Sequence, residues 1–302
     1  MKARVTKRGF TIIELLTVMS IIVILIALLV PSLNSVRRYS RVVRQKGQFH
    51  DIGTGLEMFS IDFDGYPDSK TVMAGCSSND CDMDGRPYCG AMRLCEAMIG
   101  QDGLGFHPDS RFCLNGLDKT GTIDLYPSPI TLQNQRERKH TYVDTDKYKK
   151  CPIDELYSNL GVWAAADPCA AVISDVFTTI KGQISGGKFG MPILYYKADV
   201  TKMEHAVPPT LIDVAQMQKD IYDARDNRDL VALRAANATY DHPLYIGIPT
   251  EGKSGWDIFY ENTWNKKVTA TTKPYNENTF ILISAGWDGL YGTKDDVYNF
   301  AE

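Results

Sequence analysis

The chain has 302 residues, of which 44% are hydrophobic and 23% are charged, and its formal net charge is −4. This composition is ordinary for a water-soluble domain, and the length is sufficient for one sizeable core or two small ones. The negative net charge gives no support to a nucleic-acid-binding surface, so no nucleic-acid partner is expected.

A short basic leader opens the chain. Lys2, Arg4, Lys7 and Arg8 precede Gly9, and the apolar sequence starts directly after this glycine. A secretory signal peptide has its small-residue cleavage site after the apolar core, whereas here the small residue comes first. An enzyme that cuts after Gly9 would therefore remove residues 1–9 and leave the apolar segment in the product.

Residues 10–30 form one apolar run in which Glu14 is the only ionisable side chain. An α-helix rises about 1.5 Å per residue, so the run extends over roughly 30 Å, which matches the hydrocarbon core of a bilayer. We therefore expect residues 10–30 to be a transmembrane helix in a protein that crosses the membrane once.

Glu14 needs a partner inside this apolar run. An ionised carboxylate in hydrocarbon costs on the order of 2.5–3.5 kcal/mol on insertion scales and is normally paired. Cleavage after Gly9 would free an α-amino group at Phe10, four residues away. In a stack of identical helices the amine of a neighbouring copy is an equally good partner, and this contact would set the register of a filament. The alternative is a Glu14 that is protonated or reaches the interface, without a role in assembly.

The sequence GFTIIELL at residues 9–16, followed by Pro31, resembles the class III signal of type IV pilins and of type II secretion pseudopilins. In that family a prepilin peptidase removes the leader and the new terminal Phe is methylated. The resemblance implies cleavage between Gly9 and Phe10, N-methylation of Phe10, and an assembly role for Glu14. Pro31 is at the position where many family members have a helix-kinking proline.

A second helical pattern continues the apolar run. Apolar residues recur at mostly three- and four-residue steps, which predicts an amphipathic helix over residues 31–64. Pro31 donates no hydrogen bond, so we expect a bend there, and Gly65 and Pro67 are expected to stop the helix. The apolar stripe needs a covering layer, most simply a β-sheet. Its members are Val36, Tyr39, Val42, Val43, Phe49, Ile52, Leu56, Phe59 and Phe63.

The charges on the two sides of the apolar run leave its orientation open, because basic residues follow it as closely as the leader precedes it. The leader and a cysteine cluster further along the chain favour a cytoplasmic N-terminus, with the remainder outside. The basic residues after the run would then contact anionic lipid headgroups or neighbouring subunits. They are Arg37, Arg38, Arg41, Arg44 and Lys46.

All seven cysteines lie between residues 76 and 169. They form no C-x-x-C pair, which argues against a zinc ribbon or a redox motif. An extracytoplasmic location would allow disulfides and leave one thiol over, and the alternative is a set of reduced, buried cysteines. We interpret residues 65–190 as a Cys-rich insertion. The cysteines are Cys76, Cys81, Cys89, Cys95, Cys113, Cys151 and Cys169.

One acidic stretch of this insertion, residues 80–85, begins like an EF-hand calcium loop. The match fails at the twelfth position, where Ala91 replaces the bidentate Glu, and Pro87 stiffens the loop. A solvated acidic turn is the favoured interpretation.

Hydrophobic periodicity predicts the remaining elements, and residues 191–302 are interpreted as a β-sheet region with an inserted helix. Short helices are expected at 154–159 and 170–180, a longer helix at 210–236, and strands at 192–197, 256–260 and 279–284.

The loop after the last predicted strand contains three carboxylates within nine residues, Asp288, Asp295 and Asp296. Hard oxygen ligands of this kind suit calcium, and a cation would relieve the repulsion between them. The alternative is an acidic surface turn. The loop is similar to the calcium loop of major, G-type pseudopilins, and the helix end at residues 63–67 resembles the same family. That resemblance implies Asp288, Asp295, Asp296 and the carbonyl of Ala285 as calcium ligands.

The expected fold is α+β and pilin-like: a long N-terminal helix packed on a small antiparallel sheet, with a large Cys-rich insertion. The resemblance implies a structural subunit of a pseudopilus or type IV pilus-like filament, a homo-polymer or one built with other pilins. Its other partners would be a prepilin peptidase, the membrane and an inner-membrane assembly platform. The expected location is the bacterial inner membrane, with the C-terminal part in the periplasm and the filament there or at the cell surface.

Two other functions remain open. The first is a minor or tip subunit that acts as an adhesin or ligand-binding module. The second is a membrane-anchored enzyme, which we do not expect. The chain has no G-x-S-x-G and no H-E-x-x-H, and its five histidines are scattered along the sequence.

Overall fold

The structure, a computed structural model, describes two compact units, residues 1–43 and residues 44–302. Of Pro31 and Ser32 it describes only the backbone. The described residues are 9–71, 87–148, 150–158, 160, 170–206, 219–233, 241–245, 253–268 and 271–300.

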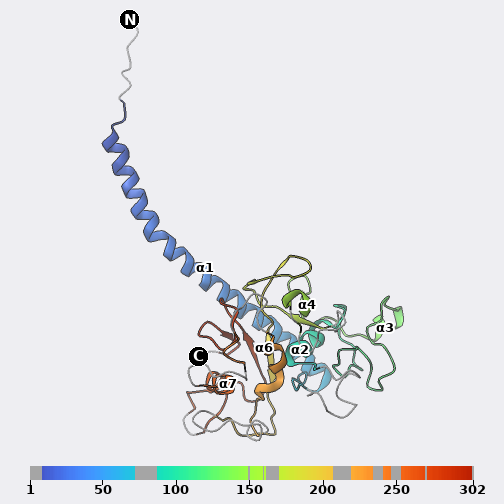
Figure 1. Cartoon of the computed structure of the whole chain (residues 1–302). Helices are drawn as coiled ribbons and strands as arrows, with labels where there is room; N and C mark the ends of the chain where they lie inside the picture. Colours follow the sequence, from blue (N-terminus) through green and yellow to red (C-terminus); the bar gives the residue numbers. More distant parts are fainter. Residues whose placement is uncertain are drawn as a thin grey trace. The chain divides into compact units, whose positions relative to one another are not determined.

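The N-terminal helix α1 (Ile12–Phe63) is one element of 52 residues, shown in blue in Figure 1. It covers both predicted helical segments and continues through Pro31, so this proline does not end the helix. The bend expected at Pro31 stays a prediction. The apolar part has a mean hydropathy of 3.0 over its best window, and none of that window is buried. By length and composition, α1 is therefore able to cross a membrane.

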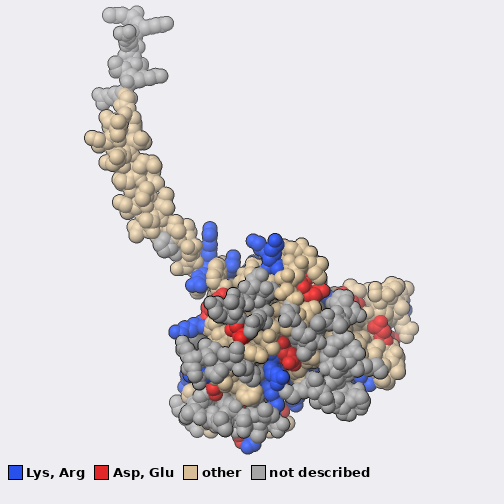
Figure 2. Space-filling view, in the orientation of Figure 1, with Lys and Arg blue, Asp and Glu red and all other residues tan. Residues whose placement is uncertain are grey.

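The surface of α1 changes character along its length. Figure 2 shows the apolar part almost entirely in tan, and Lys and Arg side chains gather further along the helix. Within residues 44–302, Phe49, Ile52, Leu56 and Phe59 are buried, which confirms the second half of the predicted apolar stripe. The first half of the predicted stripe is exposed: Val36, Tyr39 and Val43 are 60%, 72% and 52% accessible.

The helix ends at Phe63, within a residue of the predicted stop. Asp64, with φ of 56°, adopts the left-handed conformation that ends the helix. The sequence predicts a glycine in this role, whereas the next residue, Gly65, donates its N–H to the carbonyl of Ser60 at 3.1 Å. An aspartate tolerates the left-handed region better than most residues because its short polar side chain bonds locally.

The main sheet is antiparallel, with the strand order β5 (Leu194–Lys197), β6 (Phe280–Ser284) and β7 (Val297–Tyr298). Tyr195 lies opposite Leu282 in the register of β5 and β6. All five residues of the central strand β6 are buried, as its apolar sequence predicted. This sheet confirms the strands expected at 192–197 and 279–284 and, with α1, the α+β class.

Two smaller antiparallel sheets and several short helices complete the unit of residues 44–302. The small sheets pair β1 (Lys150–Pro152) with β2 (Ala171–Ile173) and β3 (Ile180–Lys181) with β4 (Lys188–Phe189). The other helices are α2 (Gly90–Ile99), α3 (Leu132–Glu137), α4 (Ile153–Leu156), η2 (Ala224–Asn227), α6 (Arg228–Ala232) and α7 (Gly255–Thr263).

Two predicted elements are wrong. The helix expected at 170–180 is replaced by β2 and the start of β3. A short apolar run that is buried on both faces has the same pattern in a strand as in a helix. The strand expected at 256–260 lies inside α7. Ser254 and Asp257 form a capping box at its N-terminus, which outweighs the strand preference of the aromatic residues.

The two other predicted helices agree with the structure only in part. The helix expected at 154–159 is shorter, since α4 ends at Leu156. Of the helix expected at 210–236, the structure places η2 and α6 in its second half, and much of its first half lies outside the described residues. The EF-hand-like stretch at 80–85 also lies outside them.

Residues of the predicted insertion share one core with the sheet. All ten residues of α2 are buried, and α2 contacts both β2 and β5. Met92 of α2, Leu194 of β5 and Ile281 of β6 belong to the same hydrophobic cluster. The elements of residues 87–191 are therefore part of the main body.

Candidate functional site

The predicted cleavage position is open to an enzyme. Gly9 and Phe10 precede α1 and are exposed, and the Phe10 side chain is 77% accessible. A Cβ atom added at Gly9 would meet no atom within 4 Å among the described residues. No described part of the chain therefore covers the bond between Gly9 and Phe10.

Glu14 lies in the first turn of α1, where it closes a capping box with Thr11. Its Oε2 accepts hydrogen bonds from the Thr11 backbone N–H at 2.8 Å and from the Thr11 hydroxyl at 2.7 Å. The Glu14 N–H in turn donates to Thr11 Oγ1 at 3.2 Å. This is the reciprocal pattern of a Thr-x-x-Glu helix start. Sequence reasoning missed it, although the spacing of Thr11 and Glu14 was the signal. The predicted ion pair with the Phe10 amine stays a prediction.

The acidic loop at the other end of the chain connects β6 to β7, and we call residues 285–296 the closing loop. Gly286, Gly289 and Gly292 have φ angles of 67°, 73° and 93°, in the left-handed region that favours glycine. At Gly286, an added Cβ would lie 2.2 Å from the carbonyl oxygen of Asp295. Only glycine therefore allows the two ends of the loop to approach this closely.

The Asp295 carboxylate accepts hydrogen bonds from several other residues of the closing loop. Its Oδ2 accepts hydrogen bonds from the N–H groups of Trp287 at 2.6 Å and Asp288 at 3.0 Å. Its Oδ1 accepts from the Thr293 hydroxyl at 2.7 Å. Burial acts to raise the pKa of Asp295, but these hydrogen bonds outweigh it and lower the pKa. Asp295 is therefore a stable carboxylate.

The pKa values of Asp288 and Asp296 are raised, whereas that of Asp295 is lowered. Burial and the nearby Asp295 carboxylate raise the pKa of Asp288, whose Oδ1 accepts the Leu290 N–H at 2.8 Å. Asp296 is more enclosed, and burial raises its pKa well above the usual range. Its Oδ2 accepts from the Gly292 N–H at 2.7 Å, while its buried Oδ1 has no hydrogen-bond partner among the described residues.

These residues offer oxygen atoms of the kind that calcium binds. Three carboxylates and the carbonyl of the buried Ala285 are all hard oxygen ligands, and the unpartnered Oδ1 of Asp296 is available for a further bond. In the arrangement seen here, the described residues contain no cluster of three or more His, Cys, Asp or Glu that is ready to hold a metal. The donor chemistry is compatible with a cation, and the three carboxyl groups would have to come closer together to bind one.

Four of the seven cysteines are described, and each is a buried free thiol. Burial raises the pKa of Cys89 and Cys95 to about 12, so both thiols are neutral at physiological pH. The disulfide prediction stays a prediction, because Cys76, Cys81 and Cys169 lie outside the described residues. The other two described cysteines are Cys113 and Cys151.

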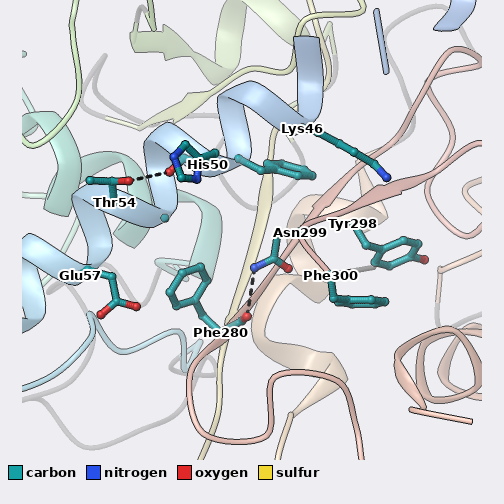
Figure 3. A pocket seen from close by; sticks show the side chains of 10 residues that line it. Lys46, His50, Thr54, Glu57, Phe280, Tyr298, Asn299 and Phe300 are labelled. Carbon is teal, nitrogen blue, oxygen red and sulfur yellow. Dashed lines mark hydrogen bonds between the residues drawn. The ribbon is translucent and has the colours of Figure 1, made fainter. Parts of the chain in front are cut away.

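Sequence reasoning also missed a groove of about 470 Å³ in the unit of residues 44–302. Its lining residues are far apart in the sequence, so no local motif signals it. One side is the part of α1 from Lys46 to Glu57, and the other is β6 with the residues at the end of the chain. Figure 3 shows His50, Thr54 and Glu57 on one side and Phe280, Tyr298, Asn299 and Phe300 on the other.

Comparison with known proteins adds evidence at the N-terminus. The family described as "Prokaryotic N-terminal methylation motif" matches residues 4–30. No curated protein and no solved structure matches the chain. The matched residues include Gly9, Phe10 and Glu14, so the chain carries the processing signal of type IV pilin-like proteins.

Proposed function

We propose that this chain is a structural subunit of a pseudopilus or type IV pilus-like filament. It is made as a precursor, cleaved by a prepilin peptidase after Gly9, methylated at Phe10 and assembled through α1. One observation carries the proposal: the methylation motif at residues 4–30 overlaps the apolar part of α1, and none of the most apolar window of this helix is buried. Exposed apolar side chains need a bilayer or other helices around them. A pilin-like subunit is surrounded by the bilayer before assembly and by the helices of other subunits in the filament.

Before assembly, α1 crosses the inner membrane once and the body of residues 44–302 lies in the periplasm. The partners are the prepilin peptidase, an assembly platform in the membrane, and further copies or related pilins. The filament then stands in the periplasm or at the cell surface. This placement is supported by the basic leader before the helix and by the resemblance of the first residues to pilin precursors.

A calcium ion bound by Asp288, Asp295, Asp296 and the Ala285 carbonyl is part of the same proposal. The support is the oxygen donor set and the unpartnered Oδ1 of Asp296. Bound calcium would neutralise the repulsion between the carboxylates and fix the closing loop at the edge of the sheet.

The test of the filament proposal is assembly with and without processing. We expect the wild-type chain, expressed with a prepilin peptidase and its assembly platform, to form filaments visible by electron microscopy. Gly9→Val places a β-branched residue at the cut and should leave an uncut precursor in the membrane without filaments. Filaments built from uncut Gly9→Val chains would contradict the proposal.

A minor or tip subunit that binds a ligand is the second candidate. The groove beside α1 favours it, because aromatic side chains and a few polar groups line a cavity large enough for a small ligand. Binding to the body by a chain that does not polymerise would favour this candidate over a repeating subunit.

A further inference from the structure

The closing loop packs against residues 174–192, which cover the end of the predicted insertion and the two residues after it. The Ser284 hydroxyl, at the end of β6, donates a hydrogen bond to Asp175 Oδ2 at 2.7 Å. The Tyr291 hydroxyl, within the loop, donates to the carbonyl of Pro192. Both contacts are buried, so the two segments form one packed layer.

Asp175 is held rigidly at the centre of this contact. It is 4% exposed, and its Oδ1 accepts the Phe177 N–H at 3.0 Å. The backbone N–H of Asp175 donates to the Met191 carbonyl at 2.8 Å. A Cβ atom at Gly190 would lie 2.1 Å from Asp175 Oδ1, so the glycine is what allows the backbone to pass this carboxyl group.

Two glutamines of α1 fix the backbone on either side of Asp175. Gln48 donates from Nε2 to the Ser174 carbonyl at 2.9 Å, and Gln45 Oε1 accepts the Val176 N–H at 3.0 Å. Both glutamines are almost fully buried. Contacts from α1 therefore hold the backbone on both sides of Asp175.

Ser284 connects Asp175 to the peptide that carries the proposed calcium ligand. While its hydroxyl donates to Asp175, its Oγ accepts the Gly286 N–H at 3.3 Å. The Gly286 N–H and the Ala285 carbonyl belong to one planar peptide unit. Fixing the direction of this N–H therefore fixes the direction of the Ala285 carbonyl.

We propose that Asp175 is a positioning residue for the cation site: through Ser284 it orients the Ala285–Gly286 peptide, so that the Ala285 carbonyl is held in place for calcium. This inference rests on the calcium site of the proposed function. It assigns a role to a residue of the predicted insertion, far from the acidic loop in sequence. The carboxylate itself does not touch the ion.

The test is calcium affinity measured by calorimetry on the full chain in detergent, with calcium chloride as the titrant. Asp175→Asn places an amide N–H against the Ser284 hydroxyl or the Phe177 N–H, and Ser284→Ala removes the connection. Loss of such an outer partner weakens metal binding about 10-fold or more, and we expect this rise in Kd for each variant. The double variant should bind no more weakly than the weaker single variant, because both substitutions break the same connection.

Glu96→Gln is the matched control. Glu96 is also a buried carboxyl with hydrogen bonds, from Tyr88 at 2.8 Å and Gln101 at 3.0 Å, but it lies in α2. We expect this variant to melt at a lower temperature without calcium and to keep the wild-type Kd.

The outcomes separate the two proposals. If the wild type binds calcium and both Asp175→Asn and Ser284→Ala bind it with the same Kd, the inference about Asp175 is wrong and the calcium site stands. If the wild type does not bind calcium, both are wrong. If Asp175→Asn does not fold, Ser284→Ala decides by the same criterion.

Discussion

At the scale of single residues, Glu14 has a structural contact and a proposed role in assembly, and the two need to be separated. The structure shows the carboxylate in a capping box with Thr11, which by itself explains a Glu at this position. The assembly role requires its negative charge. A substitution that keeps the cap and removes the charge therefore distinguishes them.

We expect Glu14→Val and Glu14→Gln both to insert into the membrane and both to form few or no filaments. Glutamine can still accept the Thr11 N–H, so Glu14→Gln keeps the helix start and loses only the charge. Electron microscopy of filaments and a membrane-fractionation assay give the two readouts. A normal filament yield from Glu14→Gln would show that assembly does not need the negative charge, so that Glu14 only caps the helix. A normal yield from Glu14→Val would show that Glu14 has no role in assembly.

A second prediction at this scale concerns the buried carboxyl of Asp226, which accepts the Ser69 hydroxyl at 2.5 Å. Burial, with the negative charge of Asp223, raises the pKa of Asp226 to about 8. In the unfolded chain this pKa is about 3.9. Between these values the folded state keeps a proton that the unfolded state has lost, so stability falls as pH rises from about 4 to 8.

Asp226→Asn imitates the protonated acid and should remove this contribution. Thermal denaturation of the full chain in detergent should show the variant gaining stability relative to wild type as pH rises from about 5 to 8. Asp199→Asn is the control, because the pKa of Asp199 is lowered and its charge is unchanged over this range. Parallel curves for wild type and Asp226→Asn would contradict the assignment.

At the scale of elements, the sequence predicted correctly those helices and strands that are determined by their own residues. The long apolar run predicted α1, and the apolar sequence of β6 predicted a covered strand. The region around α7 was misread because aromatic residues favour a strand, while the Ser254–Asp257 capping box that decides the structure was overlooked. Helix α2 was missed although its Ala, Met, Arg, Leu and Glu residues favour a helix, and burial among distant strands stabilises it further.

A prediction about the closing loop concerns the effect of calcium on thermal stability. Calcium should raise the melting temperature of the chain, because the ion binds the folded loop and not the unfolded chain. Asp288→Ala should remove most of this increase. Differential scanning calorimetry of the full chain in detergent, with calcium or with a chelator, measures both.

Asp118→Ala is the matched control for the loop. Asp118 also accepts backbone N–H groups within its own turn, from Thr122 and Ile123 at 2.9 Å each. Its loss should lower the melting temperature and leave the effect of calcium intact. An equal melting temperature with and without calcium in the wild type would count against the site.

At the scale of the whole molecule, sequence reasoning found motifs at both ends of the chain and few in its middle. The N-terminal signal and the acidic loop are contiguous motifs, so their residues can be found without knowing the fold. The groove beside α1 and the contact of Asp175 with Ser284 join residues more than a hundred positions apart. Contacts of this kind depend on the packing of the body, which periodicity does not reveal.

The body also shows why residues 65–190 are more than an added surface segment. Tyr157 and Met92 are buried in the same cluster as Leu194 and Ile283 of the sheet. A filament subunit with this body presents a surface built from both parts. Deletion of residues 87–191 would therefore expose the sheet and should unfold the body.

The central claim is that the apolar helix is kept after the leader is removed and becomes the means of assembly. Intact-mass spectrometry of the protein purified from membranes or filaments tests it most directly. The account predicts a chain that starts at Phe10 with one methyl group on its amine and retains residues 10–30. A chain that still starts at Met1, or one that lacks the apolar helix, would contradict it.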